Sequence, residues 1–227
     1  MSAADDRESL YVPALRFRWL TPAYDVVVRA TTRERAFKVA LVDQAKIANG
    51  QRVLDLACGT GTLSILIKQR CPQATVTGID GDPDILLIAS RKAAEAAVPI
   101  QFDHGLSWQL PYPDAHFNRV VSSLFFHHLS WRDKERTVRE LFRVLRPGGE
   151  LHVADWGCPT GPVMRAAFVT VQLLDGFANT RDNVQGKLMS LFESAGFSEV
   201  TQTSTFSTVL GTLALYRAVK PTGAHHD

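Results

Sequence analysis

The sequence predicts a doubly wound α/β fold in which a mostly parallel, seven-stranded sheet carries helices on both faces. Short β-branched segments alternate with longer amphipathic ones from Gln51 to Trp156, and this alternation is typical of a parallel sheet. Two last strand segments, 198–206 and 211–219, are only a few residues apart, so they should pair as an antiparallel hairpin and leave one strand antiparallel to the rest.

The 227 residues suit a single domain. Its expected parts are a helical lid (1–50), a cofactor-binding core (51–156), a helical insertion over the substrate (157–195), the closing hairpin (196–219) and a flexible tail (220–227).

The apolar spacing assigns the elements in order. In the lid, apolar residues recur at helical spacing over 23–30 and 34–48. The core is expected to contain strands at 52–57, 74–80, 99–105, 118–126 and 150–156. Helices are expected between them at 63–70, 83–97 and 131–145, with Asp82 capping the second and Pro83 in its first turn. The insertion is expected to form helices at 164–178 and 184–196.

Composition limits the function classes. Apolar residues make up 45 % and charged residues 21 % of the chain, as in ordinary globular proteins, and a net charge of +2 gives no reason to expect nucleic-acid binding. The three cysteines have neither metal-ligand nor disulfide spacing, so we expect free thiols and no metal site. No signal peptide or membrane span is evident. These features predict a cytoplasmic protein, and we expect a monomer or homodimer.

A glycine-rich turn follows the first predicted strand in the segment DLACGTGT, which begins at Asp55. Gly59 and Gly61 allow a sharp turn and a close approach to a ligand. Dinucleotide enzymes use such turns too, but their third glycine would fall at Ser64, and Asp55 would repel a pyrophosphate. A carboxylate there suits an ammonium group instead. A turn without a ligand remains the alternative.

Asp80 ends the second predicted strand, 19 residues after Gly61. A carboxylate at about this spacing accepts hydrogen bonds from ribose hydroxyls. Because Asp82 and Asp84 lie next to it, the alternative is an ordinary turn residue at the end of a strand.

Four segments occur in a fixed order, VLDLACGTGTLS, GIDGDPDIL, LPYPDAHFNRVVSS and RVLRPGGELHVADW. Together they resemble the class I S-adenosylmethionine-dependent methyltransferases, and within them the UbiE/MenG-like (methyltransferase-11) group that acts on small molecules. The resemblance implies that Gly59, Thr60 and Gly61 hold the methionine part of the cofactor above Asp55. It also implies that Asp80 binds the ribose and that Gly81 lies near the adenine.

This chain departs from the family pattern where the other edge of the adenine would bind. Family members usually read Gly-Asp-Ala where this chain reads Gly105-Leu106-Ser107. Adenine recognition would then fall to backbone groups, to Ser107 or to Asp103. Asn118 replaces the usual aspartate and is expected to be structural.

Two further positions follow from the resemblance and from the end of the fourth predicted strand. Tyr24 matches a tyrosine that often closes over the cofactor, with helix packing as the alternative. Ser123 is assigned to the cofactor site, because ligands bind beyond the carboxyl ends of such strands. His127 and His128 follow it and cannot both face one site on a regular element. His128 is the favoured general base, with packing or capping as the alternative.

The implied function is transfer of the S-adenosylmethionine methyl group to a small acceptor by in-line displacement, with S-adenosylhomocysteine as the product. A non-catalytic protein that binds either cofactor form, and an NAD(P)-dependent oxidoreductase, are the alternatives. No motif indicates the acceptor. The basic residues of segment 131–146, Lys134 among them, are expected to form a solvated helix face.

Overall fold

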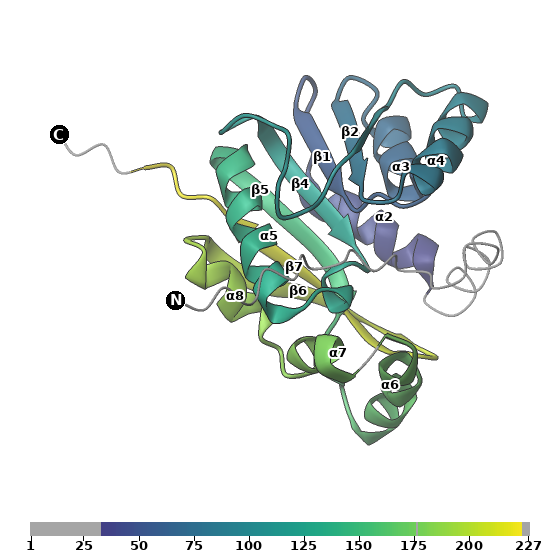
Figure 1. Cartoon of the computed structure of the whole chain (residues 1–227), viewed down its shortest axis with the longest axis vertical. Helices are drawn as coiled ribbons and strands as arrows, with labels where there is room; N and C mark the ends of the chain where they lie inside the picture. The colour runs from purple at the N-terminus through teal and green to yellow at the C-terminus, as the bar shows by residue number, and fades with distance from the viewer. Residues whose placement is uncertain (1–32, 176, 224–227) are drawn as a thin grey trace, which may run out of the picture.

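The computed structural model describes residues 33–175 and 177–223 (Figure 1). In this part of the chain a seven-stranded sheet has the order β3-β2-β1-β4-β5-β7-β6. Its strands are β1 (Arg52–Leu56), β2 (Thr75–Asp80), β3 (Gln101–His104), β4 (Phe117–Ser123), β5 (Leu145–Trp156), β6 (Ser198–Thr208) and β7 (Gly211–Val219). β7 runs antiparallel to both of its neighbours, while β1 to β5 pair in parallel. The predicted fold class is confirmed.

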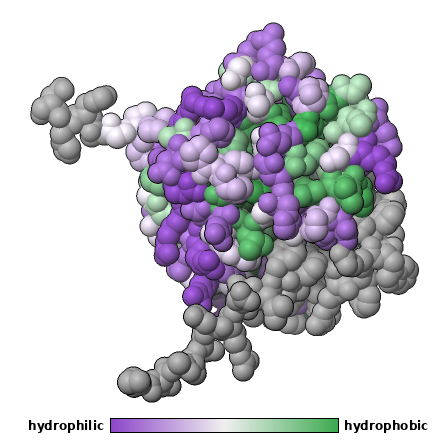
Figure 2. All heavy atoms as spheres, turned by 45° about the horizontal axis from the view of Figure 1, so that its top comes forward, coloured by the Kyte–Doolittle hydropathy of each residue, from purple (hydrophilic) through white to green (hydrophobic). Residues whose placement is uncertain are grey.

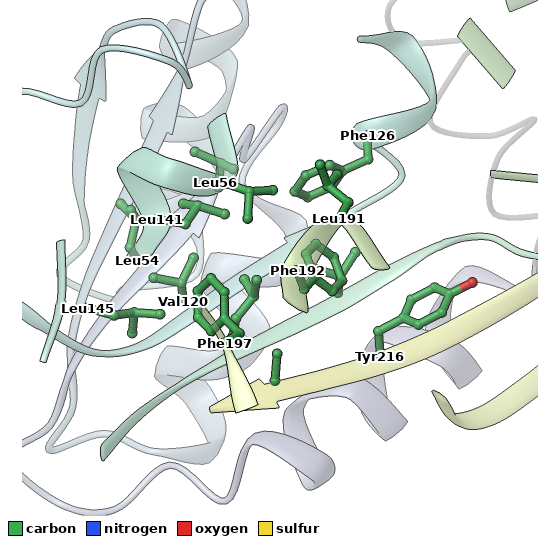
Figure 3. Close-up of a cluster of buried hydrophobic side chains, with 14 of the residues drawn as sticks. Leu54, Leu56, Val120, Phe126, Leu141, Leu145, Leu191, Phe192, Phe197 and Tyr216 are labelled. Atoms are coloured by element: carbon green, nitrogen blue, oxygen red, sulfur yellow. The ribbon is translucent and has the colours of Figure 1, made fainter. Parts of the chain in front are cut away.

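Helices cover both faces of the sheet. Those in the described residues are α2 (Glu34–Ala45), α3 (Thr62–Arg70), α4 (Pro83–Glu95), α5 (Trp131–Val144), α6 (Pro162–Asp175), α7 (Phe177–Val184) and α8 (Leu188–Ser194), and η2 (Phe126–His128) is a 3₁₀ turn. Successive strand residues face opposite sides. Val53 therefore packs with α2, α3 and α6, whereas Leu54 packs with α5 and α8 in the cluster that Figure 3 shows.

The strand order reverses between β1 and β4, which lie side by side at the centre of the sheet. The connections from these two strands lead to opposite sides of the sheet, and in folds of this kind ligands bind beyond the carboxyl ends of such strands. η2 follows β4 at that edge, and α7 contacts it. The same edge lies in the lower part of Figure 1, near α6 and α7.

Most element boundaries agree with the prediction, and the main differences are at the end of β4, in the insertion and at the start of β5. β4 ends at Ser123 instead of 126, because Leu124 adopts a positive φ of 54° and η2 follows. The helix predicted at 164–178 divides into α6 and α7, and the one predicted at 184–196 is the shorter α8. β5 begins early, since Leu145 already pairs with Phe117 before a register shift.

One side chain of α5 contradicts the predicted solvated face. Lys134 is completely buried, together with Thr137, Val138 and Leu141. Its ammonium group donates to the carbonyl of Asn179 at 2.7 Å, so this lysine joins α5 to α7.

The surface in Figure 2 mixes hydrophilic residues with a central apolar area. Within the described ranges, no helix is both long and apolar enough to cross a membrane, and no group of three or more potential metal ligands is found.

Candidate cofactor and active site

The glycine-rich loop connects β1 to α3 with the backbone geometry that its sequence predicts. Gly59 and Gly61 have positive φ values of 53° and 73°, and Gly61 is the N-cap of α3. A Cβ on Gly61 would lie 3.0 Å from the Phe102 ring, so this glycine is also needed for packing. The nearest atom to a Cβ on Gly59 would be 3.9 Å away, on Ile85, which leaves that side of the loop open to a ligand.

Asp80 ties the loop to the end of β2. One carboxylate oxygen accepts the backbone N–H of Gly59 at 2.9 Å, and the other accepts that of Asp82 at 3.0 Å. Burial raises the pKa of Asp80, and these hydrogen bonds counteract the rise. A carboxylate can accept more hydrogen bonds than these backbone groups supply, so Asp80 can also accept from a ribose hydroxyl.

Asp55 lies at 1 % exposure in β1 and accepts a 2.5 Å hydrogen bond from the hydroxyl of Ser64, in the first turn of α3. Burial raises the pKa of Asp55 to about 6. The serine at the position of a third glycine therefore has a specific partner. An additional cation would stabilise the buried carboxylate, which is consistent with an ammonium ligand.

Lys92, on α4, contacts the glycine-rich loop and was not expected from the sequence. It reaches across from α4 and donates to the hydroxyls of Thr60 at 2.8 Å and Thr62 at 2.9 Å. Thr60, expected to bind cofactor, is itself buried and thus holds the loop in place through its side chain. In the sequence, Lys92 has no feature that distinguishes it from a surface lysine.

The predicted adenine segment follows β3, and its side chains have partners within the fold. The Gly105 N–H donates to the carbonyl of Asp80 at 3.0 Å, and Leu106 is half-buried in an isolated bridge with Gln109. Ser107 is buried, and its hydroxyl shares a 2.8 Å hydrogen bond with the hydroxyl of Thr137. Of the alternatives, Asp103 accepts the Tyr112 hydroxyl at 2.8 Å.

Of the remaining expected positions, Gly81 and Ser123 lie at the carboxyl ends of β2 and β4, whereas Asn118 lies at the amino end of β4. The Gly81 carbonyl lies 3.2 Å from the His104 ring, and Ser123 is half-buried at the end of β4. Asn118 is structural, as expected, because it accepts the Arg52 N–H at 3.0 Å. Tyr24 and the predicted lid helix at 23–30 lie outside the described residues.

The two histidines occupy a 3₁₀ turn and not a regular strand or α-helix, and their rings lie next to each other. Their ring centroids are 4.0 Å apart. His127 is buried, and its Nδ1 lies 2.7 Å from Asp155. His128 keeps some exposed surface, but the dense surroundings of its ring lower its pKa to about 3.

Asp155, near the end of β5, organises this region and was not singled out from the sequence. One carboxylate oxygen accepts the backbone N–H groups of Phe125 at 3.1 Å and Phe126 at 2.7 Å. The other oxygen lies 2.7 Å from Nδ1 of His127 and accepts the Trp156 N–H, also at 2.7 Å. Although burial opposes ionisation, the histidines and these donors hold the pKa of Asp155 below its usual value.

A glycine-rich loop after β1, tied to a carboxylate at the end of β2 in a sheet of order 3-2-1-4-5-7-6, is the arrangement of a class I methyltransferase fold. Residues 53–149 match the family model described as "Methyltransferase domain". Curated relatives include the demethylmenaquinone methyltransferases of Deinococcus radiodurans (34 % identical, covering 67 % of this chain and 63 % of the relative) and Thermus thermophilus (37 %, 63 % and 65 %). This chain thus spans slightly less than two thirds of these relatives.

Solved structures share the fold at lower identity. A putative O-methyltransferase of Nostoc punctiforme superposes with a TM-score of 0.70 (22 % identity, 88 % of this chain and 59 % of that one). The cyclase SpnF gives 0.67 (21 %, 83 % and 81 %). The chain belongs to the class I S-adenosylmethionine-dependent methyltransferases, in the UbiE/MenG-like group. Because a protein titled as a cyclase shares the fold, the chemistry must be argued from the site.

Proposed function

We propose that the protein transfers the methyl group of S-adenosylmethionine to a small-molecule acceptor. The observation that carries this proposal is the loop at Gly59, which Asp80 holds from β2 while Asp55 lies below it in β1. This arrangement offers an open loop surface, a carboxylate acceptor for a ribose and a buried negative charge for an ammonium group.

Different residues would bind the methionine, ribose and adenine parts of the cofactor. Gly59, Thr60 and Gly61 would hold the methionine part, with Asp55 opposite its ammonium, and Asp80 the ribose hydroxyls. Gly81 and the segment from Gly105 to Ser107 would border the adenine. Since Ser107 and Asp103 are engaged within the fold, backbone groups and the half-buried Leu106 are the better candidates for adenine contacts.

When bound, S-adenosylmethionine supplies a methyl group that its sulfonium already activates. The protein's main task is therefore to align the acceptor for an in-line displacement and to exclude water. An acceptor that carries a proton must also lose it. The Asp155 carboxylate orients the His127 ring through Nδ1, so His127 is the proposed group at this step, whereas a pKa of about 3 makes the predicted base His128 a weak acceptor.

The relatives indicate which acceptor class to test first. Two of them are named demethylmenaquinone methyltransferases, so we propose an aromatic hydroquinone as the first acceptor. The insertion at 157–195 is the proposed acceptor cap, because α7 contacts η2 beyond the carboxyl end of β4.

The test is a turnover assay with radiolabelled S-adenosylmethionine and a panel of hydroquinone, phenol, amine and carboxylate acceptors. We expect the label to enter one acceptor class, with S-adenosylhomocysteine formed in equal amount. Tight binding of S-adenosylhomocysteine without transfer to any acceptor would favour a non-catalytic binding protein instead.

A further inference from the structure

Asn183 is a completely buried polar residue of α7 that the cofactor site does not explain. Its amide nitrogen lies 3.2 Å from the Asp155 carboxylate and 3.2 Å from the carbonyl oxygen of Trp156. Because both neighbours can only accept, the amide must turn its nitrogen toward them, which fixes its orientation. Its oxygen is then left without a hydrogen-bond partner in the described part of the chain.

This orientation is unfavourable for stability alone. A buried amide oxygen without a partner loses the hydrogen bonds that water would give it, whereas a leucine of similar size would avoid that loss. The presence of an asparagine is therefore better explained by what its nitrogen does. That nitrogen donates to the same carboxylate oxygen that the His127 ring contacts.

The position of Asn183 in the fold gives this contact a further consequence. Asp155 has four other such contacts, to the backbone N–H groups of residues 125, 126 and 156 and to the ring of His127. They come from η2, from the residue before it, or from β5. Asn183 comes from the insertion. Among the described contacts of Asp155 it supplies the side-chain link to α7, so the geometry of the carboxylate depends on how α7 is seated.

We infer that Asn183 is a positioning residue for the His127–Asp155 pair. It adds a donor from α7 to the carboxylate oxygen that faces His127, and so helps to keep Nδ1–H of His127 directed at Asp155, with Nε2 turned the other way. Asp155 can only accept, so the ring nitrogen that faces it carries the proton. The role in catalysis rests on the proposed methyl transfer, whereas the positioning itself does not.

The experiment uses the full chain, labelled with ¹⁵N at histidine and saturated with S-adenosylhomocysteine. Imidazole NMR reports which ring nitrogen of His127 carries the proton and how fast that proton exchanges. Asn183→Leu removes two hydrogen bonds together with the unpaired oxygen, so these effects on stability oppose each other, and a melting curve confirms that the variant is folded. Asn179→Ala is the matched control on the same helix, because Asn179 donates to the backbone carbonyl of His128 and not to Asp155.

In the wild type and in Asn179→Ala we expect a slowly exchanging Nδ1 proton on His127. In Asn183→Leu we expect that proton to exchange at least tenfold faster. With an acceptor that turns over, Asn183→Leu should lower kcat about tenfold, change the KM for the acceptor less than twofold and leave S-adenosylhomocysteine affinity unchanged. Asn183→Gln, which retains a donor, should recover part of the loss.

The inference is overturned if Asn183→Leu leaves both the proton signal and kcat unchanged, or if Asn179→Ala has the same effect as Asn183→Leu. The second result would mean that only the general docking of α7 matters. If the wild type transfers no methyl group to any acceptor, the proposed function fails, while the NMR comparison still decides whether Asn183 positions the pair.

Discussion

At the scale of single residues, Asp55 shows a conflict between stability and the proposed binding role. The fold buries its carboxylate almost completely, and the Ser64 hydroxyl compensates only in part, so the pKa remains at about 6. The folded state therefore binds a proton more readily than the unfolded chain, whose aspartate has an ordinary pKa of 3.8. As the pH rises between these two values, the ionised carboxylate progressively destabilises the protein.

This conflict predicts the effect of Asp55→Asn without cofactor. The variant should be more stable than the wild type at pH 7–8, by up to about 3 kcal/mol. The difference should diminish between pH 6 and pH 4 and vanish below pH 4, where Asp55 is protonated in both states. At the same time, S-adenosylmethionine affinity should fall at least tenfold. Chemical denaturation from pH 4 to 8 and calorimetry measure both effects. A variant that is less stable at pH 8 and binds normally would contradict this reading of Asp55.

Leu106 provides a second prediction for a single residue, because it stands where the family has a carboxylate. If it borders the adenine, Leu106→Asp should tighten S-adenosylhomocysteine binding by about 1 kcal/mol, or about fivefold, through one new hydrogen bond to the adenine amino group. Leu106→Asn should give a smaller gain. Neither variant should improve the binding of an S-adenosylhomocysteine analogue that lacks the adenine amino group. Equal affinities in all combinations would place the adenine elsewhere.

At the scale of elements, the insertion is fastened to the core by polar side chains. Lys134 extends from α5 to the Asn179 carbonyl and lies 3.9 Å from the carboxylate of Asp182, and burial lowers its pKa. Asn179 in turn donates to the backbone of His128. Because hydrogen bonds of this kind depend on precise geometry, the seating of α7 should respond to single substitutions.

The Lys134→Met variant tests this attachment. It leaves the Asn179 carbonyl without its donor, so α7 should detach more readily, and trypsin should cleave at the exposed Arg181 and Lys187 several times faster. The free energy of unfolding should fall by about 1–3 kcal/mol. Arg139→Met, an exposed change on the same helix, is the control. Identical cleavage rates in the two variants would show that Lys134 does not hold α7.

The elements and the loop could be predicted because their signals are local. Gly59, Gly61 and Asp80 lie close enough in sequence for spacing alone to indicate a shared site. The residues that were missed act over longer distances, such as Lys92 on Thr60 across 32 positions and Lys134 on Asn179 across 45. The burial of Lys134 also depends on the insertion, whose helix boundaries the apolar spacing predicted least well.

At the scale of the whole molecule, the sheet brings the two halves of the site together. β1 and β2 supply Asp55 and Asp80. On the other side of the reversal in strand order, β5 supplies Asp155, and η2, which follows β4, carries the two histidines. The cofactor part and the polar pair are thus carried by the same sheet. A rigid sheet of this kind sets the separation between the proposed methyl donor and the acceptor.

The central claim is that the Gly59 loop and Asp80 bind S-adenosylmethionine, and isothermal titration calorimetry tests it most directly. We predict that the wild type binds S-adenosylhomocysteine and S-adenosylmethionine but not NADH or NADPH. Asp80→Asn should weaken both at least tenfold, because it removes the charge on the acceptor of the ribose hydroxyls. Asp84→Asn, which removes the same charge from a nearby exposed position, should bind like the wild type. Tighter binding of a nicotinamide cofactor, or unchanged affinity in Asp80→Asn, would contradict the account.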